Sequence, residues 1–287
     1  MSNYLKRPTT NKKYALFFVL SLLPMFFYSI YKYSIMPWLQ GFNNYLELLK
    51  VPSLLLINII IVFLYNFHNH KPNYYLYYET SVLVLLLPIT VSYYLSAILC
   101  LLYLLFNRLL AGKKINCLAL SLLIGYFGLF FLNQLNYLAV YESSIPNAFT
   151  TIDMFFGHSI APIGASSPFL IIITYFLLSL NNLYKKDIPW HLFIFYLFLV
   201  FSIGIYSGTA INIIKNTLNS NILLSFVCLI PLNYASPITK KGELWYCFFI
   251  SALTFFLLPI VSYFASFIAS ILCSLVYSLI SFIKKPR

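Results

Sequence analysis

Ionisable side chains are scarce in the apolar parts of this 287-residue sequence. Glu79 is the only acid deep inside an apolar run, and such a carboxylate typically marks an ion or proton path because it is costly to place in lipid. Glu79 has a second interpretation, since a glutamate near the end of a run can extend its carboxylate to the water interface. The histidines fall at run ends or in connections, at a spacing that does not predict a metal site: His68, His70, His158 and His191.

Hydroxyl side chains gather in residues 136–158, the longest segment between two apolar runs. The segment contains no Lys or Arg and carries two acids, Glu142 and Asp153. Long connections in compact proteins are often functional, so one interpretation is a lid or a cofactor-binding loop. A solvated loop without a binding role is the alternative.

Two further strings have unusual composition. In SPITKKGELWY, residues 236–246, Pro237 fixes a turn and Gly242 permits a tight turn into the next helix. The string GHSIAPIGASSPF, residues 157–169, combines two glycines, two prolines and three serines. Such a segment packs poorly as a helix that faces lipid. We therefore predict that its backbone is buried in protein, close to a ligand or a partner.

Apolar residues make up 61% of the chain and charged residues only 8%, whereas a soluble domain carries about 25% charged residues. This composition predicts a single polytopic membrane domain over residues 1–287. A transmembrane helix needs about 20 apolar residues. Such runs occupy 14–30, 48–67, 115–135, 159–180, 188–207 and, with more polar residues, 218–235; 73–107 and 244–282 each hold two more, divided near Pro88 and Pro259. We therefore predict an all-α membrane protein with about ten transmembrane helices.

The basic residues give this arrangement a direction. Of 18 Lys and Arg, which outweigh 6 Asp and Glu, only Lys32, Lys50 and Lys215 fall on the external side if the N-terminus is cytoplasmic. Cytoplasmic loops carry an excess of Lys and Arg, so we predict both termini on the cytoplasmic side of the membrane and no nucleic-acid partner. The cytoplasmic basic residues are Lys6, Arg7, Lys12, Lys13, Lys71, Arg108, Lys113, Lys114, Lys185, Lys186, Lys240, Lys241, Lys284, Lys285 and Arg287.

Two short strings indicate an internal repeat. Glu79-Thr80-Ser81 and Ser220-Asn221 each precede an apolar segment that ends in proline. They begin the third and eighth predicted helices, five helices apart, so the two halves would have opposite orientations. This pattern predicts a five-plus-five inverted repeat, which is common in transporter-like folds. The five cysteines are scattered without a C-x-x-C spacing, and we interpret them as small buried hydrophobic residues.

Several strings together resemble the NqrB/RnfD family, specifically its RnfD branch in the Rnf-type ion-translocating oxidoreductase complex. Residues 231–243, PLNYASPITKKGE, resemble the family signature T-D-x-V-T-S-P-T-T-x-x-G-R and form the most specific match. The GHSIAPIGASS string and Asp187-Ile-Pro-Trp-His191 look like the family's G-x-x-x-G-S-I-G-E-T-S segment and its later W-x-I-P stretch. ETSVLVLLLP, residues 79–88, resembles its D-x-S-x-x-x-T-G-L-L-L segment.

The resemblance implies a membrane subunit of an electron-transport complex that moves Na⁺ or H⁺ across the inner membrane. Such a subunit works with other membrane and peripheral subunits as part of a redox-driven translocase rather than as a catalyst by itself. It also implies FMN, attached through its phosphate to a threonine in an S-G-A-T motif on an external loop. Residues 136–158 fall where that motif is expected. Ser236 and Thr239, in the matched late signature, are further candidates for cofactor binding.

This chain departs from the family pattern at the flavin-attachment motif. Ile145 stands at the position of the threonine and has no oxygen with which to form a phosphoester. Ser144, Thr150 and Thr151 are the nearby hydroxyls that would substitute after a small shift. Non-covalent FMN and a scaffold role without flavin are the two alternatives to covalent attachment.

A solute transporter or channel on a similar inverted-repeat scaffold is the alternative function. Such a protein requires a polar site at the bilayer midplane. The candidates for that site here are Ser, Asn and Gly residues at broken helices.

Overall fold

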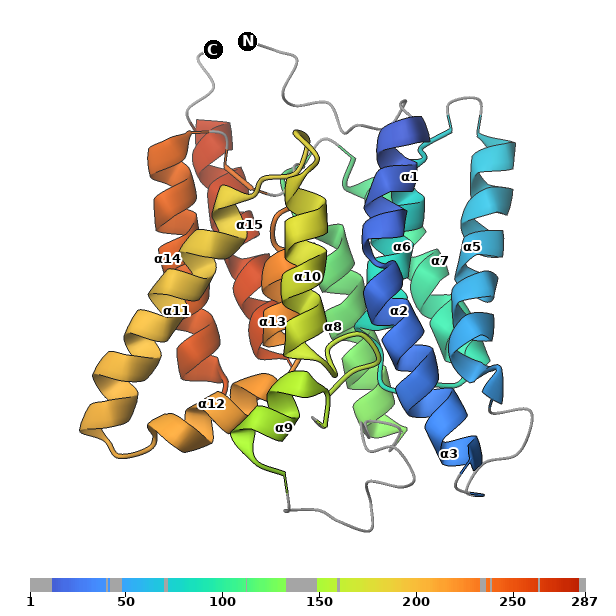
Figure 1. Ribbon diagram of the computed structural model, residues 1–287. Coiled ribbons are helices and arrows are strands. Elements are labelled where there is room, and N and C mark those ends of the chain that lie inside the picture. The colour runs from blue at the N-terminus through green and yellow to red at the C-terminus, as the bar shows by residue number, and fades with distance from the viewer. Residues whose placement is uncertain are drawn as a thin grey trace.

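The computed structural model describes residues 12–39, 41, 48–69, 72–111, 113–132, 149–158, 161–232, 236–237, 239–262 and 264–283. All regular secondary structure in these residues is helical, which confirms the all-α prediction (Figure 1). The α-helices, and the π-helices η2 and η4, are α1 Lys12–Ser21, α2 Leu23–Ile30, η2 Tyr31–Ile35, α3 Met36–Leu39, α5 Lys50–His68, α6 Tyr75–Leu85, α7 Tyr93–Leu109, α8 Cys117–Phe131, α9 Thr151–Phe156, α10 Pro168–Ser179, α11 Asp187–Tyr206, α12 Ala210–Leu218, α13 Ile222–Leu224, η4 Ser225–Leu229, α14 Lys240–Leu257 and α15 Ala265–Ile283.

By length, some of these helices could span a membrane and others are too short. In the described residues, α5 and α11 are each long and apolar enough to cross a membrane, and α1 with Leu23–Leu39 would form a third, bent span. Shorter apolar helices are α7, α8, α10 and most of α15.

The first span bends by 41° between α1 and the segment that begins at Leu23. Pro24 lies in the first turn of α2, where its missing N–H and its ring interrupt the helical hydrogen bonds from the preceding turn. The helix then widens into the π-helix η2. A π-helical turn inside a longer helix is often found at a functional site.

The third and eighth predicted spans are much shorter as helices than expected. α6 has 11 residues and is about 16 Å long, roughly half of the ~30 Å hydrocarbon core. α13 and η4 together cover only Ile222–Leu229. Pro88 and Pro231 follow the two helix ends, and the residue before a proline is disfavoured in the α-conformation. The sixth span is shortened too, because α10 begins at Pro168 rather than near residue 159.

The same order of packing partners recurs in the two halves of the chain. α5 packs on α6 and α7, and α7 packs on α8. Likewise α11 packs on η4 and α14, and α14 packs on α15. The halves meet where α8 packs on α15 and where α1 and α2 pack on α10.

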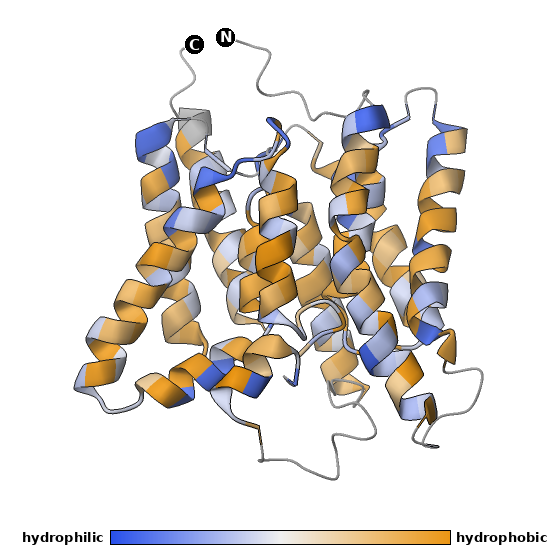
Figure 2. Cartoon of the chain, viewed as in Figure 1, coloured by the Kyte–Doolittle hydropathy of each residue, from blue (hydrophilic) through white to orange (hydrophobic). Residues whose placement is uncertain are grey.

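The helices form one bundle in which the start of α1 and the end of α15 lie at the same end (Figure 1). Figure 2 shows hydrophilic residues at this end, at the starts of α1 and α14 and between α10 and α11. The middle of the bundle is mainly hydrophobic, and α9 and α12 lie across its opposite end (Figures 1 and 2). We call the end with the start of α1 the basic end.

Candidate functional site

Glu79 lies in the middle of α6 and is fully buried. The hydroxyl of Tyr103, from α7, donates a hydrogen bond to its Oε2. The interpretation that this carboxylate reaches the water interface is therefore wrong. Glu79 is the only acidic residue that is buried in the described part of the chain. Burying an ionisable group in a membrane protein is costly, so this position is a candidate for ion or proton handling.

The end of α6 lies six residues after Glu79. Groups from distant parts of the chain donate hydrogen bonds to its last carbonyls. The N–H groups of Ile163 and Gly164 donate to the carbonyls of Leu87 at 3.0 Å and Leu85 at 2.7 Å. The hydroxyl of Tyr126 donates to the carbonyl of Leu86. The last carbonyls of a helix have no hydrogen-bond partner within that helix, and in a membrane interior there is no water to supply one. These bonds therefore let α6 end inside the protein.

Residues 161–167 supply two of these bonds and are buried throughout. This confirms the predicted burial for residues 161–167 of the GHSIAPIGASSPF string. His158 and Phe169, near its two ends, are exposed, and Ser159 and Ile160 lie outside the described residues. Gly164 is required there because a Cβ at this position would lie 2.6 Å from the Cβ of Leu85.

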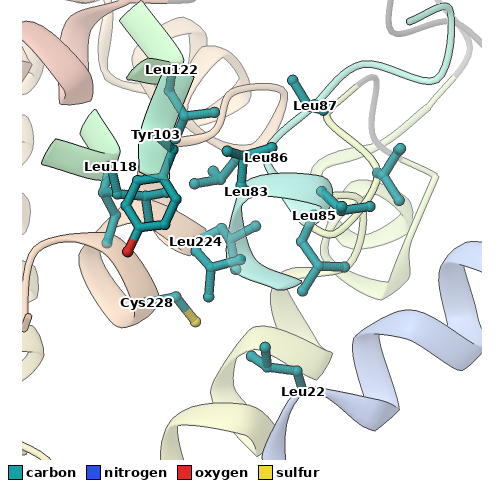
Figure 3. Close-up of a cluster of buried hydrophobic side chains, with 14 of the residues drawn as sticks. Leu22, Leu83, Leu85, Leu86, Leu87, Tyr103, Leu118, Leu122, Leu224 and Cys228 are labelled. Carbon is teal, nitrogen blue, oxygen red and sulfur yellow. The ribbon is translucent and has the colours of Figure 1, made fainter. Parts of the chain in front are cut away.

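At the end of η4, side chains instead of backbone N–H groups donate hydrogen bonds to the last carbonyls. Tyr184 donates to the carbonyl of Val227 at 2.7 Å, and Asn116 donates to that of Leu229 at 3.0 Å. Tyr78, the neighbour of Glu79 on α6, donates a long bond of 3.5 Å to the carbonyl of Cys228. Figure 3 shows Tyr103 and Cys228 among leucines such as Leu83 on α6 and Leu224 on α13. The two short helices thus contribute to one core cluster and are linked by the Tyr78 hydroxyl.

A row of serines on α15 continues the polar contacts of η4. Ser266 donates to Asn221 Oδ1 at 2.9 Å and lies 3.0 Å from Ser225 Oγ. One turn later, Ser270 accepts from Asn116 Nδ2 at 2.9 Å, and a further turn on, Ser274 accepts from the N–H of Asn116 at 3.3 Å. Sequence reasoning missed this row, although spacing of four residues places the three serines on one helix face. The three serines thus provide polar groups beside η4, the broken helix of the second half.

Lys32 lies in η2 and is only 2% exposed. Its Nζ donates to the carbonyl of Gly157 at 2.8 Å, at the end of α9. Ser29 and Tyr33 on the same stretch bond the carbonyls of Ile163 at 2.7 Å and Ala161 at 2.9 Å. Lys32 therefore links the end of α9 to the first span, whose helix continues to Leu39, beyond the predicted end at residue 30. Its place on the external side stays a prediction.

The predicted flavin loop is described only at its end. Ser144 and Ile145 lie outside the described residues. Thr150 caps α9, and its hydroxyl lies 2.7 Å from Asp153 Oδ2 and accepts from the N–H of Asp153 at 3.3 Å. Two hydrogen bonds lower the pKa of Asp153 and keep its carboxylate negative. The larger effect comes from the Thr150 hydroxyl and the smaller one from the Thr150 N–H. A phosphate would be repelled there, so Thr150 does not fit as the attachment residue. Thr151 is the first residue of α9.

Ser236 and Thr239 both stabilise the turn before α14. Ser236 is buried and donates to the carbonyl of Leu232 at 3.1 Å. Thr239 caps α14 by accepting from the N–H of Gly242 at 3.2 Å. Their hydroxyls thus have structural partners, and a role in cofactor binding stays a prediction.

Lys185, between α10 and α11, fixes this turn from the side. Its Nζ donates to Ser236 Oγ at 2.7 Å and to the carbonyl of Pro237 at 2.9 Å. Burial lowers the pKa of Lys185, and nearby Glu243 opposes that shift. Sequence reasoning counted Lys185 only as a cytoplasmic charge, and nothing in its spacing indicates this contact.

Substituting Lys185 by Met is expected to destabilise the protein by roughly 1.5–3 kcal/mol, the usual contribution of hydrogen bonds to a charged group. Ser236 and Pro237 would lose their donor. Thermal unfolding of the purified protein measures the effect, with Lys186→Met as the matched control because Lys186 is exposed. Equal melting temperatures for the two variants would contradict this role of Lys185.

Comparison with curated proteins gives no match. A family model, described as the NQR2, RnfD, RnfE family, matches residues 1–287. This agrees with the resemblance carried by the PLNYASPITKKGE and GHSIAPIGASS strings. The chain therefore belongs to the NQR2, RnfD, RnfE family, a family of membrane-integral subunits of complexes that transport electrons and ions.

Proposed function

We propose that this chain is the RnfD-type membrane component of an Rnf-type complex, which couples electron transfer to Na⁺ or H⁺ movement across a bacterial inner membrane. The observation that carries the proposal is Glu79, fully buried in a half-length helix of a chain from this family. A carboxylate at such a place serves either ion: it accepts a proton, or it offers the oxygen ligands that a hard cation prefers.

We also propose the ten-span, five-plus-five arrangement with both termini cytoplasmic. The recurring packing order of the two halves supports the repeat, because each short helix, α6 and η4, packs on the long apolar helix of its own half. Under this arrangement the basic end faces the cytoplasm, as the positive-inside rule requires. Glu79 then lies between the basic end and the middle of the membrane.

The residues around Glu79 suit an ion better than a large solute. Tyr103 occupies one side of the Glu79 carboxylate. On α6, the neighbours of Glu79 are buried from Tyr78 to Leu85. A transporter for a larger solute requires a cavity at the midplane. Tyr103 instead lies in a cluster of packed apolar side chains (Figure 3), which supports an ion over a larger solute.

For the cofactor, we propose that FMN is not covalently attached to this chain. Thr150 is held against the Asp153 carboxylate, and Ile145 lacks a hydroxyl. Denatured protein should therefore show no flavin fluorescence at the mass of this chain on a gel. A fluorescent band at that mass would contradict the proposal and direct attention to Ser144 and Thr151.

Purification of the tagged chain from native membranes tests the assignment to a complex. We expect subunits with iron–sulfur clusters and a flavoprotein to co-purify in fixed proportion. If the chain purifies alone and catalyses solute uptake in vesicles, it is a transporter or channel instead.

A further inference from the structure

A groove lies between the start of α1 and the end of α10, at the basic end of the bundle (Figure 1). Its volume is about 300 Å³. Its lining combines one cation and two amides with apolar and aromatic groups: Lys13, Tyr14, Phe17, Leu180, Asn181 and Asn182. The groove is therefore suited to a ligand that is itself part polar and part apolar.

Asn181, one of the residues that line this groove, carries an unsatisfied hydrogen-bond donor. The side chain is only 6% exposed, and its Oδ1 accepts from the N–H of Leu183 at 3.0 Å. Its Nδ2 is buried and has no hydrogen-bond partner in the described part of the chain. Leaving a buried donor unsatisfied costs about 1–3 kcal/mol, so an acceptor from a ligand would be stabilising.

Outside the groove, the helices present apolar side chains away from the bundle. Leu16 and Leu20 on α1 are exposed, as is Phe176 on α10, and the two helices pack against each other. Polar donors at the end of the bundle and apolar side chains along it match a phospholipid, whose phosphate lies at the interface and whose acyl chains lie in the hydrocarbon core. Lys13 adds a positive charge at the level of the phosphate.

We propose that this groove binds an anionic phospholipid, with its phosphodiester between Lys13 and Asn181 and an acyl chain along α1 and α10. The ammonium of Lys13 attracts the negative charge, and the amide of Asn181 donates to a phosphate oxygen. The site depends on the chain being in a membrane and is separate from Glu79. Its test is therefore independent of the redox assignment.

Native mass spectrometry of the purified full-length chain, titrated with dioleoyl phosphatidylglycerol, measures occupancy of the groove. Asn181→Asp is the sharpest variant because it keeps the oxygen that accepts from Leu183 but replaces the NH₂ donor by an oxygen that repels phosphate. Lys13→Gln removes the charge and serves if Asn181→Asp fails to fold. Lys12→Gln is the matched control, since Lys12 is an exposed neighbour that does not line the groove.

We expect the wild-type protein and Lys12→Gln to retain one phosphatidylglycerol more than Asn181→Asp. Lys13→Gln should bind this lipid about fivefold more weakly, the effect of one basic side chain at an anionic lipid surface. Unchanged lipid binding in both groove variants would overturn the proposal. So would equal binding of dioleoyl phosphatidylcholine, or displacement of the lipid by millimolar inorganic phosphate, which would indicate a site for the free anion.

Discussion

Substituting Glu79 by Gln is expected to reduce electron-driven ion movement at least about tenfold, a loss that corresponds to about 1.4 kcal/mol of ion stabilisation. Glutamine has the same shape and still accepts a hydrogen bond from Tyr103, but it neither carries a proton nor holds a negative charge. The complex should therefore assemble normally. Ion uptake into membrane vesicles during oxidation of a reduced donor measures the effect.

Two further variants show whether the effect belongs to Glu79. Asp187→Asn removes an exposed acid at the start of α11 and should leave ion movement unchanged. Tyr103→Phe removes the hydroxyl that donates to Glu79 and should produce a smaller loss than Glu79→Gln. If Glu79→Gln moved ions at the wild-type rate, Glu79 would be a structural residue.

Adding a single methyl group at Gly164 is expected to destabilise the protein by about 1–3 kcal/mol, as overpacking of a well-packed core does. The new Cβ would lie 2.6 Å from the Cβ of Leu85, which has no rotational freedom to move away. Segment 161–167 would have to shift, and the 2.7 Å bond from the Gly164 N–H to the Leu85 carbonyl would lengthen. Thermal unfolding of Gly164→Ala measures this change.

Gly128→Ala is the matched control, because it adds the same methyl group in the interior of α8, where the new Cβ meets nothing within 4 Å beyond its own turn of helix. Alanine is favoured over glycine inside a helix by roughly 0.5–1 kcal/mol, so this variant should melt at the wild-type temperature or above it. If Gly164→Ala melted no lower than Gly128→Ala, the close packing of α6 on the 161–167 segment would be wrong.

Composition and proline positions were sufficient to predict the helical architecture and several helix boundaries. Low charge and long apolar runs predicted the helices, and Pro88 predicted the break after α6. The pattern of glycine, proline and serine in residues 157–169 predicted a buried backbone, because such residues form poor lipid-facing helices. The structure confirms this for residues 161–167.

Hydropathy could not predict which apolar runs are shortened helices. α6 and η4 end inside the protein because Ile163, Gly164, Tyr184 and Asn116 satisfy their last carbonyls, and these partners come from distant parts of the sequence. For the same reason the burial of Lys32 could not be predicted, because its tertiary partner, the carbonyl of Gly157, is distant in the sequence. The burial of Glu79 likewise depends on α7, which supplies Tyr103.

Participation of this chain in ion movement driven by electron transfer is the central claim. Ion uptake into inverted membrane vesicles, measured while a reduced donor is oxidised, tests it most directly when vesicles from a deletion strain are compared with vesicles from the same strain carrying the wild-type gene. We predict that deletion abolishes donor-dependent uptake of Na⁺ or H⁺ and that the wild-type gene restores it. Equal uptake by the two kinds of vesicle would contradict this claim.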